Sequence, residues 1–596
     1  MDLFCIVRLV TKKRFYDIVL AYMTCKNCST DFNILPEDIS LYEKLKVPPP
    51  TWCPECRCIR RMVHRNERNL YRRTCDITGK NMISIYRPDC PFTICDQDYY
   101  FSDAFDAMEF GRDYDPTRTF FDQFGEFAKT VPLAGLFLRS SVNCVYNQDM
   151  GECSNCYLCS RTHNSQNILY GYRVNKSSDC VDCFQATEAS ETLYECFDTI
   201  SCNNSQFLHI CEKCSDSSFL YNCVGCVDCF MCTNQRNKSN CYKNVQYSAE
   251  EYKKILASYE LGTRSGIERA LGEFEDFVNQ FPHKNLTIIR ADNVSGDNII
   301  ESKNCRGVFN VKKLENCGYI WDSKKFTDSM DTYSGMNADL IYDSTATTSH
   351  SSNCHFCVRV YESSIDCEYS WFLKTCRNCF GCSGLFNKEY CIFNKQYSKE
   401  EYEVKVKEIK DNMMRDGEYG EFFPLALSPF PYNDTVAHEY FPLTEEKAEL
   451  WGMGWGATEE KNYATTMQAD ALPDTIDEVT DVILSEVIAC EHAGTCLHGC
   501  TKAFRIVADE LDFYRKRNIP LPKQCPNCRY YRRLAYRNPT RLRDTVCMCG
   551  TSSSAYENTV PHDHGSGLCN KGIATTVPAD SKKIIYCEEC YKAEIF

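Results

Sequence analysis

A step of about twelve residues runs through the middle of the chain and constrains the fold more than any other feature. Short runs of Tyr, Phe, Val, Ile or Leu recur with Ser, Asn, Asp and Gly between them. The positions that mark the steps are Cys144, Cys156, Asn167, Cys180, Thr192, Gln206, Ser218, Cys229 and Cys241, then Cys305, Cys317, Ser329, Cys354, Cys367, Cys379 and Cys391. Short strands at a constant step are typical of a parallel β-solenoid. Because twelve residues are few for a full coil, we expect two steps to form one rung.

The solenoid is itself doubled. NKSNCYKNVQYSAEEYKK (237–254) returns 150 residues later as NKEYCIFNKQYSKEEYEVK (387–405). In each copy Ser-x-Glu-Glu has the pattern of a capping box that opens a helix. This predicts two related solenoid halves, 141–247 and 291–397, whose ends are capped by charged helices that protect the strand edges.

The chain contains 43 cysteines, many in Cys-x-x-Cys pairs that are too close for a relaxed disulfide. In the middle of the chain we interpret them as compact buried side chains that line a narrow core. Metal binding or redox chemistry is the alternative. We expect any exception at the two densest groups, which are Cys223, Cys226, Cys229 and Cys232, and Cys376, Cys379 and Cys382.

A second duplication places one module at each end of the solenoid. CPECRCIRRMVHRNERNLYRRTC (53–75) returns 472 residues later as CPNCRYYRRLAYRNPTRLRDTVC (525–547). The offset holds without a gap from Cys28 and Cys500 onward. We therefore expect two related modules of the treble-clef or zinc-ribbon kind.

The cysteine pairs of these modules have the spacing of structural zinc sites. The predicted ligands are Cys25, Cys28, Cys53 and Cys56 in the first module, Cys496, Cys500, Cys525 and Cys528 in the second, and Cys547, Cys549, Cys587 and Cys590 in a further C-terminal site. Four buried free thiols are the alternative, but they would not explain why the pairing returns at the other end. We expect about three structural Zn²⁺ ions.

The first module is expected to lack the further site. When the two copies are aligned, Asp96 stands opposite Cys587 and Tyr99 opposite Cys590, so the second cysteine pair is missing. Cys90 and Cys95 are an alternative pair, although their spacing does not suit a zinc knuckle.

The further C-terminal site spans a Gly/Ser-rich insertion, 550–580. His562 and His564 in that insertion are candidate nitrogen ligands. A solvated pair of histidines in a polar loop is the plainer interpretation.

An arginine-rich helix is expected behind the second cysteine pair of each module. Its arginines are Arg57, Arg60, Arg61 and Arg65 in the first copy, and Arg529, Arg532, Arg533 and Arg537 in the second. A one-sided arginine face suggests contacts with phosphate. Pairing with a protein partner, or with the acidic, aromatic segment Asp96–Phe127 of the same chain, is the interpretation we favour. The net charge of −15 argues against nucleic-acid binding by the whole surface.

These observations predict a multidomain, mainly β chain. The expected parts are an extension (1–22), the N-terminal zinc module (23–95), an acidic aromatic-rich helical connector (96–140), solenoid half 1 (141–247), a helical insertion (248–290), solenoid half 2 (291–397), a helix and linker (398–475) and the C-terminal zinc modules (476–596).

The combination of motifs resembles one known family. The motifs are the arginine-rich stretches after CPEC and CPNC, CDITGK, ISIYRPD, the repeated NK-x-x-C and YS-x-EEY, and the terminal YCEECY. The family consists of large cysteine-rich proteins, expected to bind zinc, that are widespread in candidate-phyla bacteria and some giant viruses. The resemblance covers roughly residues 23–596. It implies zinc modules and a repetitive middle, and it implies no activity, because none is established for the family.

For function, we expect a non-enzymatic, zinc-stabilised scaffold that binds a protein partner. A nucleic-acid-binding protein that uses the arginine helices is the alternative, and a thiol redox or solenoid-surface enzyme is the second alternative. No phosphate-binding loop, dinucleotide fingerprint, HExxH or GxSxG motif occurs, and no catalytic residue or small-molecule substrate is predicted. With no secretory signal and no apolar stretch of 18 residues, we expect no membrane contact and a reducing, cytoplasmic location, or a virion or host cytoplasm for a viral protein.

Overall fold

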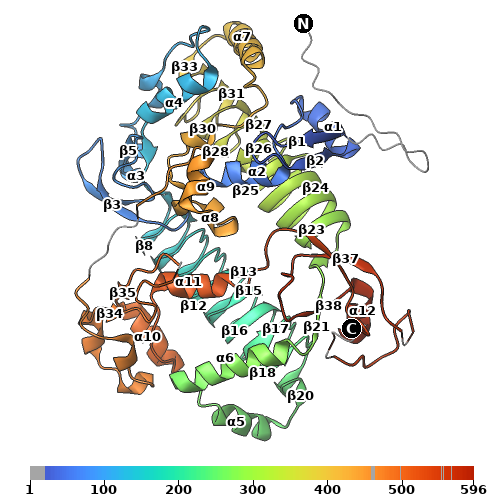
Figure 1. The fold of residues 1–596 in the computed structure, drawn as a ribbon. Helices are drawn as coiled ribbons and strands as arrows, with labels where there is room; N and C mark the ends of the chain where they lie inside the picture. Colours follow the sequence, from blue (N-terminus) through green and yellow to red (C-terminus); the bar gives the residue numbers. More distant parts are fainter. Residues whose placement is uncertain are drawn as a thin grey trace. The chain divides into compact units, whose positions relative to one another are not determined.

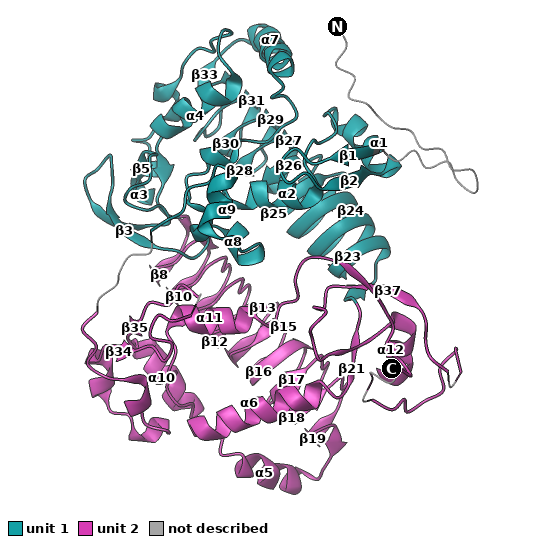
Figure 2. Ribbon diagram, in the orientation of Figure 1, with its two compact units in different colours: residues 1–136, 286–457 teal, residues 137–285, 458–596 magenta. Residues whose placement is uncertain are grey.

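Two stacks of short parallel strands dominate the computed structural model (Figure 1). It describes residues 21–595 except 458–462, 497, 552, 553, 555 and 566, so the predicted extension lies outside the described residues up to position 20. The chain forms two compact units, each built from two separate stretches (Figure 2). Unit 1 comprises Met1–Leu136 and Leu286–Ala457, and unit 2 comprises Phe137–Asn285 and Thr458–Phe596. Each unit therefore combines one end module with the solenoid half that is distant from it in sequence.

The solenoid of unit 2 is a stack of parallel strands that ends in an antiparallel hairpin. Along its main face lie β8 (Val142–Val145), β10 (Ser154–Tyr157), β11 (Gln166–Leu169), β12 (Ser178–Val181), β14 (Glu191–Tyr194), β16 (Asn203–Glu212), β17 (Ser218–Tyr221), β18 (Val227–Thr233), β19 (Ser239–Tyr242) and β20 (Val245–Gln246). Further strands on its other faces are β7 (Leu138–Arg139), β9 (Met150–Gly151), β13 (Phe184–Thr187) and β15 (Phe197–Ile200).

The solenoid of unit 1 has the same plan. Its strands are β22 (Ile288–Ile289), β23 (Asp292–Ile300), β24 (Lys303–Thr327), β25 (Met330–Asp339), β26 (Tyr342–Thr345), β27 (Thr348–His355), β28 (Val358–Tyr361), β29 (Ile365–Glu368), β30 (Trp371–Lys374), β31 (Arg377–Phe380), β32 (Glu389–Ile392) and β33 (Lys395–Gln396). The hairpins that end the two stacks, β19–β20 and β32–β33, start 150 residues apart, so the predicted doubling of the solenoid is confirmed.

One step of the sequence ladder is a full coil, and our expectation of two steps per rung is wrong. Ser154 pairs in parallel with Gln166, and Cys156 with Ile168, each one step along the chain. The coil closes this quickly because the backbone takes the left-handed conformation at every third residue. Between Asn143 and Asn155 the left-handed residues are Asn143, Tyr146, Asp149, Glu152 and Asn155, with φ between 53° and 57°. Each left-handed residue bends the chain sharply, and we call it a corner. Four corners, three residues apart, complete one coil of twelve residues.

Asparagine ladders stabilise one of these corners. The side-chain amide of Asn143 donates to the Oδ1 atom of Asn155 at 2.9 Å, Asn155 donates to Asn167 at 3.0 Å, and Asn167 donates to Asp179 at 3.0 Å. Left-handed backbone costs an L-residue about 1–2 kcal/mol, and Asn and Asp tolerate it best. The small polar residues between the strands are therefore the residues that make the coil possible.

The mid-chain cysteines lie inside the coils, as predicted. In unit 2 they form one core cluster with a few aliphatic side chains, and Cys223, Cys226, Cys229 and Cys232 belong to it. Cys376, Cys379 and Cys382 are equally buried in unit 1. The Cys202 thiol donates to the carbonyl oxygens of Ile200 and Cys211, both at 3.5 Å, so it fills space and pairs with the backbone of the next coil. Burial also raises the pKa of the Cys357 thiol, which keeps it protonated.

Helices cap the last coil of each solenoid, as the capping boxes predict. Helix α5 (Ala249–Ser258) begins after Ser248, whose hydroxyl accepts a hydrogen bond from the Glu251 amide. Helix α7 (Lys399–Asp416) begins after Ser398 in the same way. In unit 2, α6 (Arg264–Val278) packs across β17 and β18.

The two end modules have the same core elements. The first contains β1 (Ala21–Thr24), β2 (Asp31–Ile34), α1 (Pro36–Leu45), α2 (Pro54–Met62), β3 (Tyr71–Thr74) and β4 (Asn81–Ser84). The second contains β34 (Ile488–Ala489), β35 (Ala503–Phe504), α10 (Ala508–Arg517), α11 (Pro526–Leu534), β36 (Arg543–Val546), β37 (Gly572–Thr575), β38 (Ile584–Tyr586) and α12 (Glu588–Ile595). Helices α10 and α11 begin and end 472 residues after α1 and α2, which confirms the duplication.

The remaining segments cover the sides of the solenoids. Unit 1 adds β5 (Ile94–Cys95), α3 (Gln97–Tyr100), α4 (Phe120–Thr130), β6 (Leu133–Ala134), α8 (Val436–Tyr440), α9 (Glu445–Leu450) and the short 3-10 turns η1 (Ala107–Phe110), η2 (Leu425–Leu427) and η3 (Tyr432–Asp434). Unit 2 adds β21 (Pro282–Lys284), which pairs with β38, and the turns η4 (Ala469–Ala471), η5 (Ile476–Glu478) and η6 (Asp481–Ser485). Within the described part of the chain, every helix is too short or too polar to cross a membrane.

The left-handed corners generate a first prediction. Asn155→Val places a β-branched residue at φ 53° and removes two bonds of the ladder, so we expect the strain alone to lower the stability of unit 2 by roughly 1–2 kcal/mol. Asn155→Gly also removes both ladder bonds but accepts this φ without strain. Thermal unfolding of the two variants should therefore rank Val below Gly, and equal midpoints would contradict the assignment of strain to the corner.

Candidate metal centres and the buried arginine helices

The first candidate metal centre lies where the β1–β2 hairpin meets α2. Cys25 directly follows β1, Cys28 lies in the turn, Cys53 is the N-cap of α2, and Cys56 lies in its first turn. The four Sγ atoms lie within 4.8 Å of one another, and those of Cys28 and Cys53 are 3.8 Å apart. With Zn–S bonds of about 2.3 Å, two sulfur ligands of a tetrahedral zinc ion lie about 3.8 Å apart. The four predicted cysteines thus form a cluster that could hold such an ion.

The start of α2 favours thiolates in this cluster. The positive end of the helix dipole lies at the N-cap, Cys53. Hydrogen bonding from Cys56 lowers the pKa of the Cys53 thiol to about 5. The side-chain amide of Asn27 donates to the Cys56 Sγ atom at 3.4 Å. These contacts favour a thiolate at Cys53, whereas burial raises the pKa of Cys25 and the hydrogen bond to Cys53 raises the pKa of Cys56.

The corresponding cluster of the second module contains a cysteine that the sequence analysis missed. Cys490, Cys500, Cys525 and Cys528 come together, whereas Cys496 was expected in place of Cys490. Cys490 directly follows β34 just as Cys25 follows β1, so these two are the equivalent ligands. The knuckle between Cys490 and Cys500 is seven residues longer than the Cys25–Cys28 knuckle, and this insertion displaced the sequence alignment. The short strand before Cys490 is the signal that would have identified it.

The further C-terminal cluster also differs from the prediction by one ligand. Cys547, Cys569, Cys587 and Cys590 converge, and Cys569 replaces the expected Cys549. The Sγ atoms of Cys569 and Cys587 are 3.9 Å apart, and the backbone amide of Cys587 donates to Cys547 Sγ at 3.1 Å. Cys547 follows β36 and Cys569 precedes β37, so the β36–β37 hairpin supplies two ligands together, which a search for Cys-x-Cys spacing could not reveal.

The displaced cysteines lie in two additional mixed clusters. The first consists of His492, Cys496, His498 and Cys528, and the second of Cys549, His562, His564 and Cys590. All ligand atoms within each cluster again lie within 4.8 Å of one another. The sequence analysis treated His562 and His564 as candidates and missed His492 and His498. The described residues thus contain five clusters that could hold a metal ion.

The first module has no counterpart of the Cys547 cluster among the described residues. Its Cys75 accepts a hydrogen bond from the Asp96 backbone amide at 3.3 Å, as Cys547 accepts one from Cys587. Asp96 therefore occupies the position of Cys587, and its carboxylate caps α3 by accepting from the Tyr99 amide. The alternative ligands Cys90 and Cys95 instead donate to backbone carbonyls of Pro429 and Leu133.

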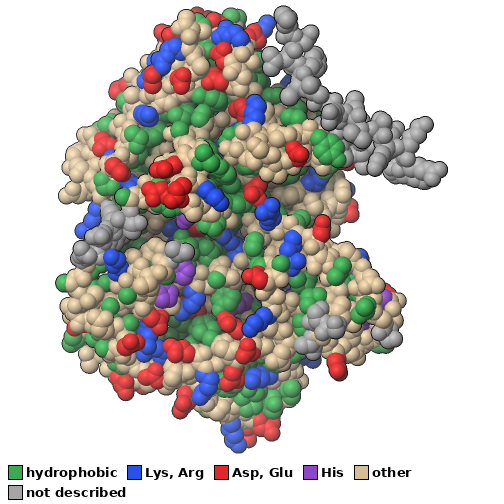
Figure 3. All heavy atoms as spheres, viewed as in Figure 1, with side chains coloured by type: hydrophobic (Ala, Val, Ile, Leu, Met, Phe, Trp, Pro, Cys, Tyr) green, Lys and Arg blue, Asp and Glu red, His purple; other side chains and the backbone are tan. Residues whose placement is uncertain are grey.

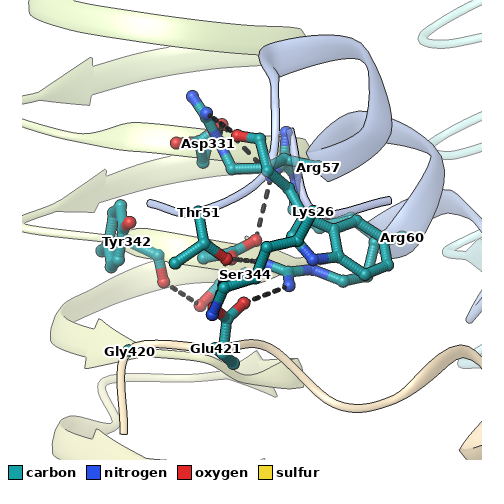
Figure 4. Close-up of polar contacts among 12 residues, drawn as sticks. Lys26, Thr51, Arg57, Arg60, Asp331, Tyr342, Ser344, Gly420 and Glu421 are labelled. Atoms are coloured by element: carbon teal, nitrogen blue, oxygen red, sulfur yellow. Dashed lines mark hydrogen bonds and ion pairs between the residues drawn. The ribbon is translucent and has the colours of Figure 1, made fainter. Parts of the chain in front are cut away.

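The arginines of α2 are buried against carboxylates at the corners of the unit 1 solenoid. Arg57 donates to Asp331 at 2.9 Å, and Arg60 donates to Glu421 at 3.0 Å (Figure 4). Arg60 also donates to Asp343 at 2.6 Å. Arg61 bridges Asp331 and Asp343 at 3.2 and 2.9 Å, respectively. The two aspartates occupy left-handed corners, one coil apart. The helix thereby attaches the first end module to two successive coils.

Helix α11 has the same arrangement in unit 2. Arg529 donates to Asp182 at 2.5 Å and to Glu510 at 3.2 Å, and Arg533 pairs with Asp182 at 2.9 Å and Glu195 at 3.4 Å. Asp182 and Glu195 are again left-handed corners of successive coils. The Arg529 guanidinium also lies 4.4 Å from the centre of the Tyr170 ring. Burial alone would lower the pKa of Arg529, but Asp182 and its neighbours raise it well above the usual value.

These contacts correct the expected partner of the arginines. Arg57, Arg60 and Arg61 pair with the solenoid and Glu421, not with the acidic segment Asp96–Phe127. That segment instead packs its aromatic side chains on the same solenoid, for example Phe124 at 5.2 Å from Trp371 between ring centres.

The eight arginines differ in exposure. Six of them are buried: Arg57, Arg60, Arg61, Arg65, Arg529 and Arg533. Arg65 pairs with Glu67. The side chain of Arg532 is 43% exposed and pairs with Glu195, and Arg537 is partly buried. On the face shown in Figure 3, Lys and Arg side chains alternate with Asp and Glu. The arrangement of these arginines therefore resembles an internal ion-pair network more than a phosphate-binding surface.

Comparisons with known proteins add little. No family model matches the chain, and no curated protein matches it. Among solved structures, one from Desulfovibrio desulfuricans G20, described as a "putative acetyltransferase", has 11% identity and a TM-score of 0.09, and the match covers 38% of this chain and 63% of that one. A similarity this weak supports no statement about fold or activity.

The buried ion pairs generate a second prediction. Asp331→Ala leaves the buried guanidinium groups of Arg57 and Arg61 without their shared carboxylate, so we expect unit 1 to lose about 3–5 kcal/mol of stability. Arg118→Ala, which removes an exposed pair with Glu126, is the control and should leave the unfolding midpoint unchanged. Denaturant unfolding measures both, and equal midpoints for the two variants would show that the helix is not anchored through Asp331.

Proposed function

We propose that the protein is a non-enzymatic scaffold whose end modules are stabilised by structural zinc and whose solenoids present repetitive surfaces to a protein partner. The observation that carries the proposal is the closure of the cysteine clusters. Each of the clusters Cys25–Cys56, Cys490–Cys528 and Cys547–Cys590 offers four thiolates to one ion. A tetrahedral ion held by four protein ligands keeps no position for water or substrate, which is the hallmark of a structural site.

The chemistry of the donors favours zinc in these clusters. Thiolates select soft or borderline ions, and a tetrahedral set of four sulfurs suits Zn²⁺ or an iron–sulfur centre. Two pairs of ligands contributed by a short hairpin and a helix start are the arrangement of treble-clef zinc modules. Zinc bound here is expected to supply folding free energy to modules that have small cores of their own.

The arginine helices support a structural role for the modules. In both units the same helix carries one pair of cysteine ligands at its start and buried arginines behind them. A metal ion that orders the start of the helix therefore also orders its ion pairs with two coils of the solenoid. This arrangement fits a clamp that attaches each end module to two coils in the interior of its solenoid stack. It gives no support to phosphate binding, which would need the guanidinium groups exposed.

The solenoid surface is the part that suits partner binding. The ladder Asn143–Asn155–Asn167–Asp179 is exposed and repeats its amide groups once per coil. A regular row of hydrogen-bonding groups on a rigid support matches the extended binding surfaces of repeat proteins. Free core thiols and thiolate ligands need a reducing compartment, such as the cytoplasm, to persist.

The proposal is tested by comparing a ligand cysteine with a core cysteine. Cys25→Ser should release about one zinc ion per chain and open the first module to trypsin, because that cluster loses a ligand. Cys214→Ser is the matched control. Ser217, three residues along the same solenoid, already points inward, and its hydroxyl donates to the carbonyl two residues before it, as the Cys214 thiol does. Elemental analysis and proteolysis measure both variants.

The result that would contradict the proposal is an unchanged metal content and an intact first module in Cys25→Ser. Purified wild-type protein that carries iron in place of zinc, or that turns over a thiol substrate, would instead favour the redox alternative. Nucleic acid that co-purifies and leaves in high salt would favour the nucleic-acid alternative.

A further inference from the structure

The two C-terminal cysteine clusters each share one sulfur atom with a mixed histidine–cysteine cluster. Cys528 belongs both to the set with Cys490, Cys500 and Cys525 and to the set with His492, Cys496 and His498. Cys590 belongs both to the set with Cys547, Cys569 and Cys587 and to the set with Cys549, His562 and His564. Each combined centre contains five cysteines and two histidines, although the two segments have unrelated sequences.

We propose that each C-terminal centre binds two divalent metal ions bridged by one thiolate, Cys528 in the first and Cys590 in the second. A thiolate sulfur has several lone pairs and can bind two ions at once. The proposal rests on the zinc-binding function proposed above and extends it from three ions to five. It adds two sites with mixed sulfur and nitrogen donors, which suit zinc.

The distances around Cys528 fit a bridging position. Its Sγ atom lies 3.8 Å from Cys490 Sγ and 3.5 Å from Cys525 Sγ on the four-thiolate side, and 3.6 Å from Cys496 Sγ on the mixed side. The bond lengths of zinc give about 3.8 Å between two sulfur ligands and about 3.3 Å between two nitrogen ligands. Cys528 is thus at ligand distance from both sets.

The inserted loop explains why only the second module has this extra set. All three additional ligands, His492, Cys496 and His498, lie in the lengthened knuckle between Cys490 and Cys500. In the first module the equivalent of Cys528 is Cys56, and the Asn27 amide donates to its Sγ atom at 3.4 Å. The remaining lone pair of Cys56 thus accepts a hydrogen bond from a neutral amide, whereas the remaining lone pair of Cys528 would bind a second ion. The first module is the natural mononuclear counterpart.

The histidines of the first centre are held in place but lack partners for one nitrogen each. The Nδ1 atoms of His492 and His498 are both buried without a hydrogen bond. The His498 ring stacks on Tyr531, with 5.2 Å between ring centres, which fixes its orientation. Buried polar atoms without partners are rare and costly, and a metal ion with imidazole ligands would account for this environment.

In the second centre a carboxylate prepares one histidine for ligation. The buried Glu594 carboxylate lies 2.8 Å from His562 Nε2, which assigns the proton to that nitrogen and leaves the lone pair on Nδ1. His562 Nδ1 in turn lies 3.1 Å from Cys549 Sγ and 3.3 Å from His564 Nε2. His564 Nε2 lies 3.4 Å from Cys590 Sγ. A carboxylate behind a histidine ligand is the usual support of a zinc site.

Charge also favours two ions over one. Five thiolates around a single divalent ion would leave a large uncompensated negative charge in a buried cluster, or would require several thiols to stay protonated. Two divalent ions balance most of that charge. The mixed set of the first centre is more exposed than its four-thiolate set, so we expect its ion to exchange first with added chelator.

The test compares bridging and non-bridging ligands in the purified full-length chain. We expect five zinc ions per wild-type chain by elemental analysis, a loss of two in Cys528→Ser, and a loss of one in its counterpart Cys56→Ser. Because Cys528→Ser removes a ligand from the four-thiolate set and is expected to unfold the module, Cys496→Ser and His498→Ala provide the second measurement. Each should lose one ion and leave the module resistant to trypsin. His350→Ala, an exposed histidine in unit 1, is the control and should lose none.

The thiolate bridge between two ions is detected by cadmium-113 NMR of the chain loaded with cadmium. Two ions that share a thiolate sulfur show scalar coupling to each other, and the Cys25–Cys56 ion shows none. Three ions per wild-type chain, with Cys496→Ser and His498→Ala unchanged, would overturn the binuclear proposal but leave the proposed function intact. Five uncoupled ions would overturn the bridge alone, and a metal-free chain would overturn the proposed function itself.

Discussion

The left-handed backbone at every third residue is the constraint on which the structure depends. It reduces each coil to about twelve residues, so the interior is narrow. Cysteines and a few aliphatic side chains fill it, and the cysteine thiols pair with the backbone of the next coil. It also turns the corner residues outward. Asn corners form ladders, and acidic corners such as Asp331, Asp343 and Asp182 receive the arginine helices. Core, surface and attachment points thus share one backbone pattern.

The arginine helices connect the candidate metal clusters to the solenoids. Each begins with two cysteine ligands and continues with guanidinium groups that are buried with carboxylates. A buried ion pair stabilises little by itself, because desolvation opposes the attraction, but it is strongly specific: a misplaced helix leaves buried charges unpaired. The ion pairs therefore select which coils each end module contacts, and under the proposed function an ion bound at the cysteine clusters would supply folding free energy.

Much of this could be predicted from the sequence, because duplication and periodicity survive in residue patterns. The equivalence of α2 and α11, the doubled solenoid and the capping boxes at Ser248 and Ser398 all follow from such patterns. The number of residues per coil could not be predicted in this way, because hydrophobic periodicity does not show that Asn155 or Tyr146 adopts positive φ.

Ligands and partners were harder to predict wherever an insertion or a distant segment intervened. Cys490 was missed because its knuckle to Cys500 is seven residues longer than the Cys25–Cys28 knuckle. Cys569 was missed because the β36–β37 hairpin brings it to Cys547 across a long loop. The carboxylate that pairs with Arg57, Asp331, lies far along the chain. Acidic residues are common there, and nothing in the sequence distinguishes Asp331 from the others. Local pattern therefore predicted the elements, and long-range packing determined their partners.

Hydrogen exchange measured by mass spectrometry, on the metal-loaded and the chelator-treated chain, tests the central claim most directly. The account predicts that chelation removes protection from the helices α2 and α11 and from the knuckles that precede them, while the inner coils of both solenoids stay protected. Unchanged protection of α2 and α11 after complete metal removal would contradict it, because the clusters would then not be what orders the arginine helices.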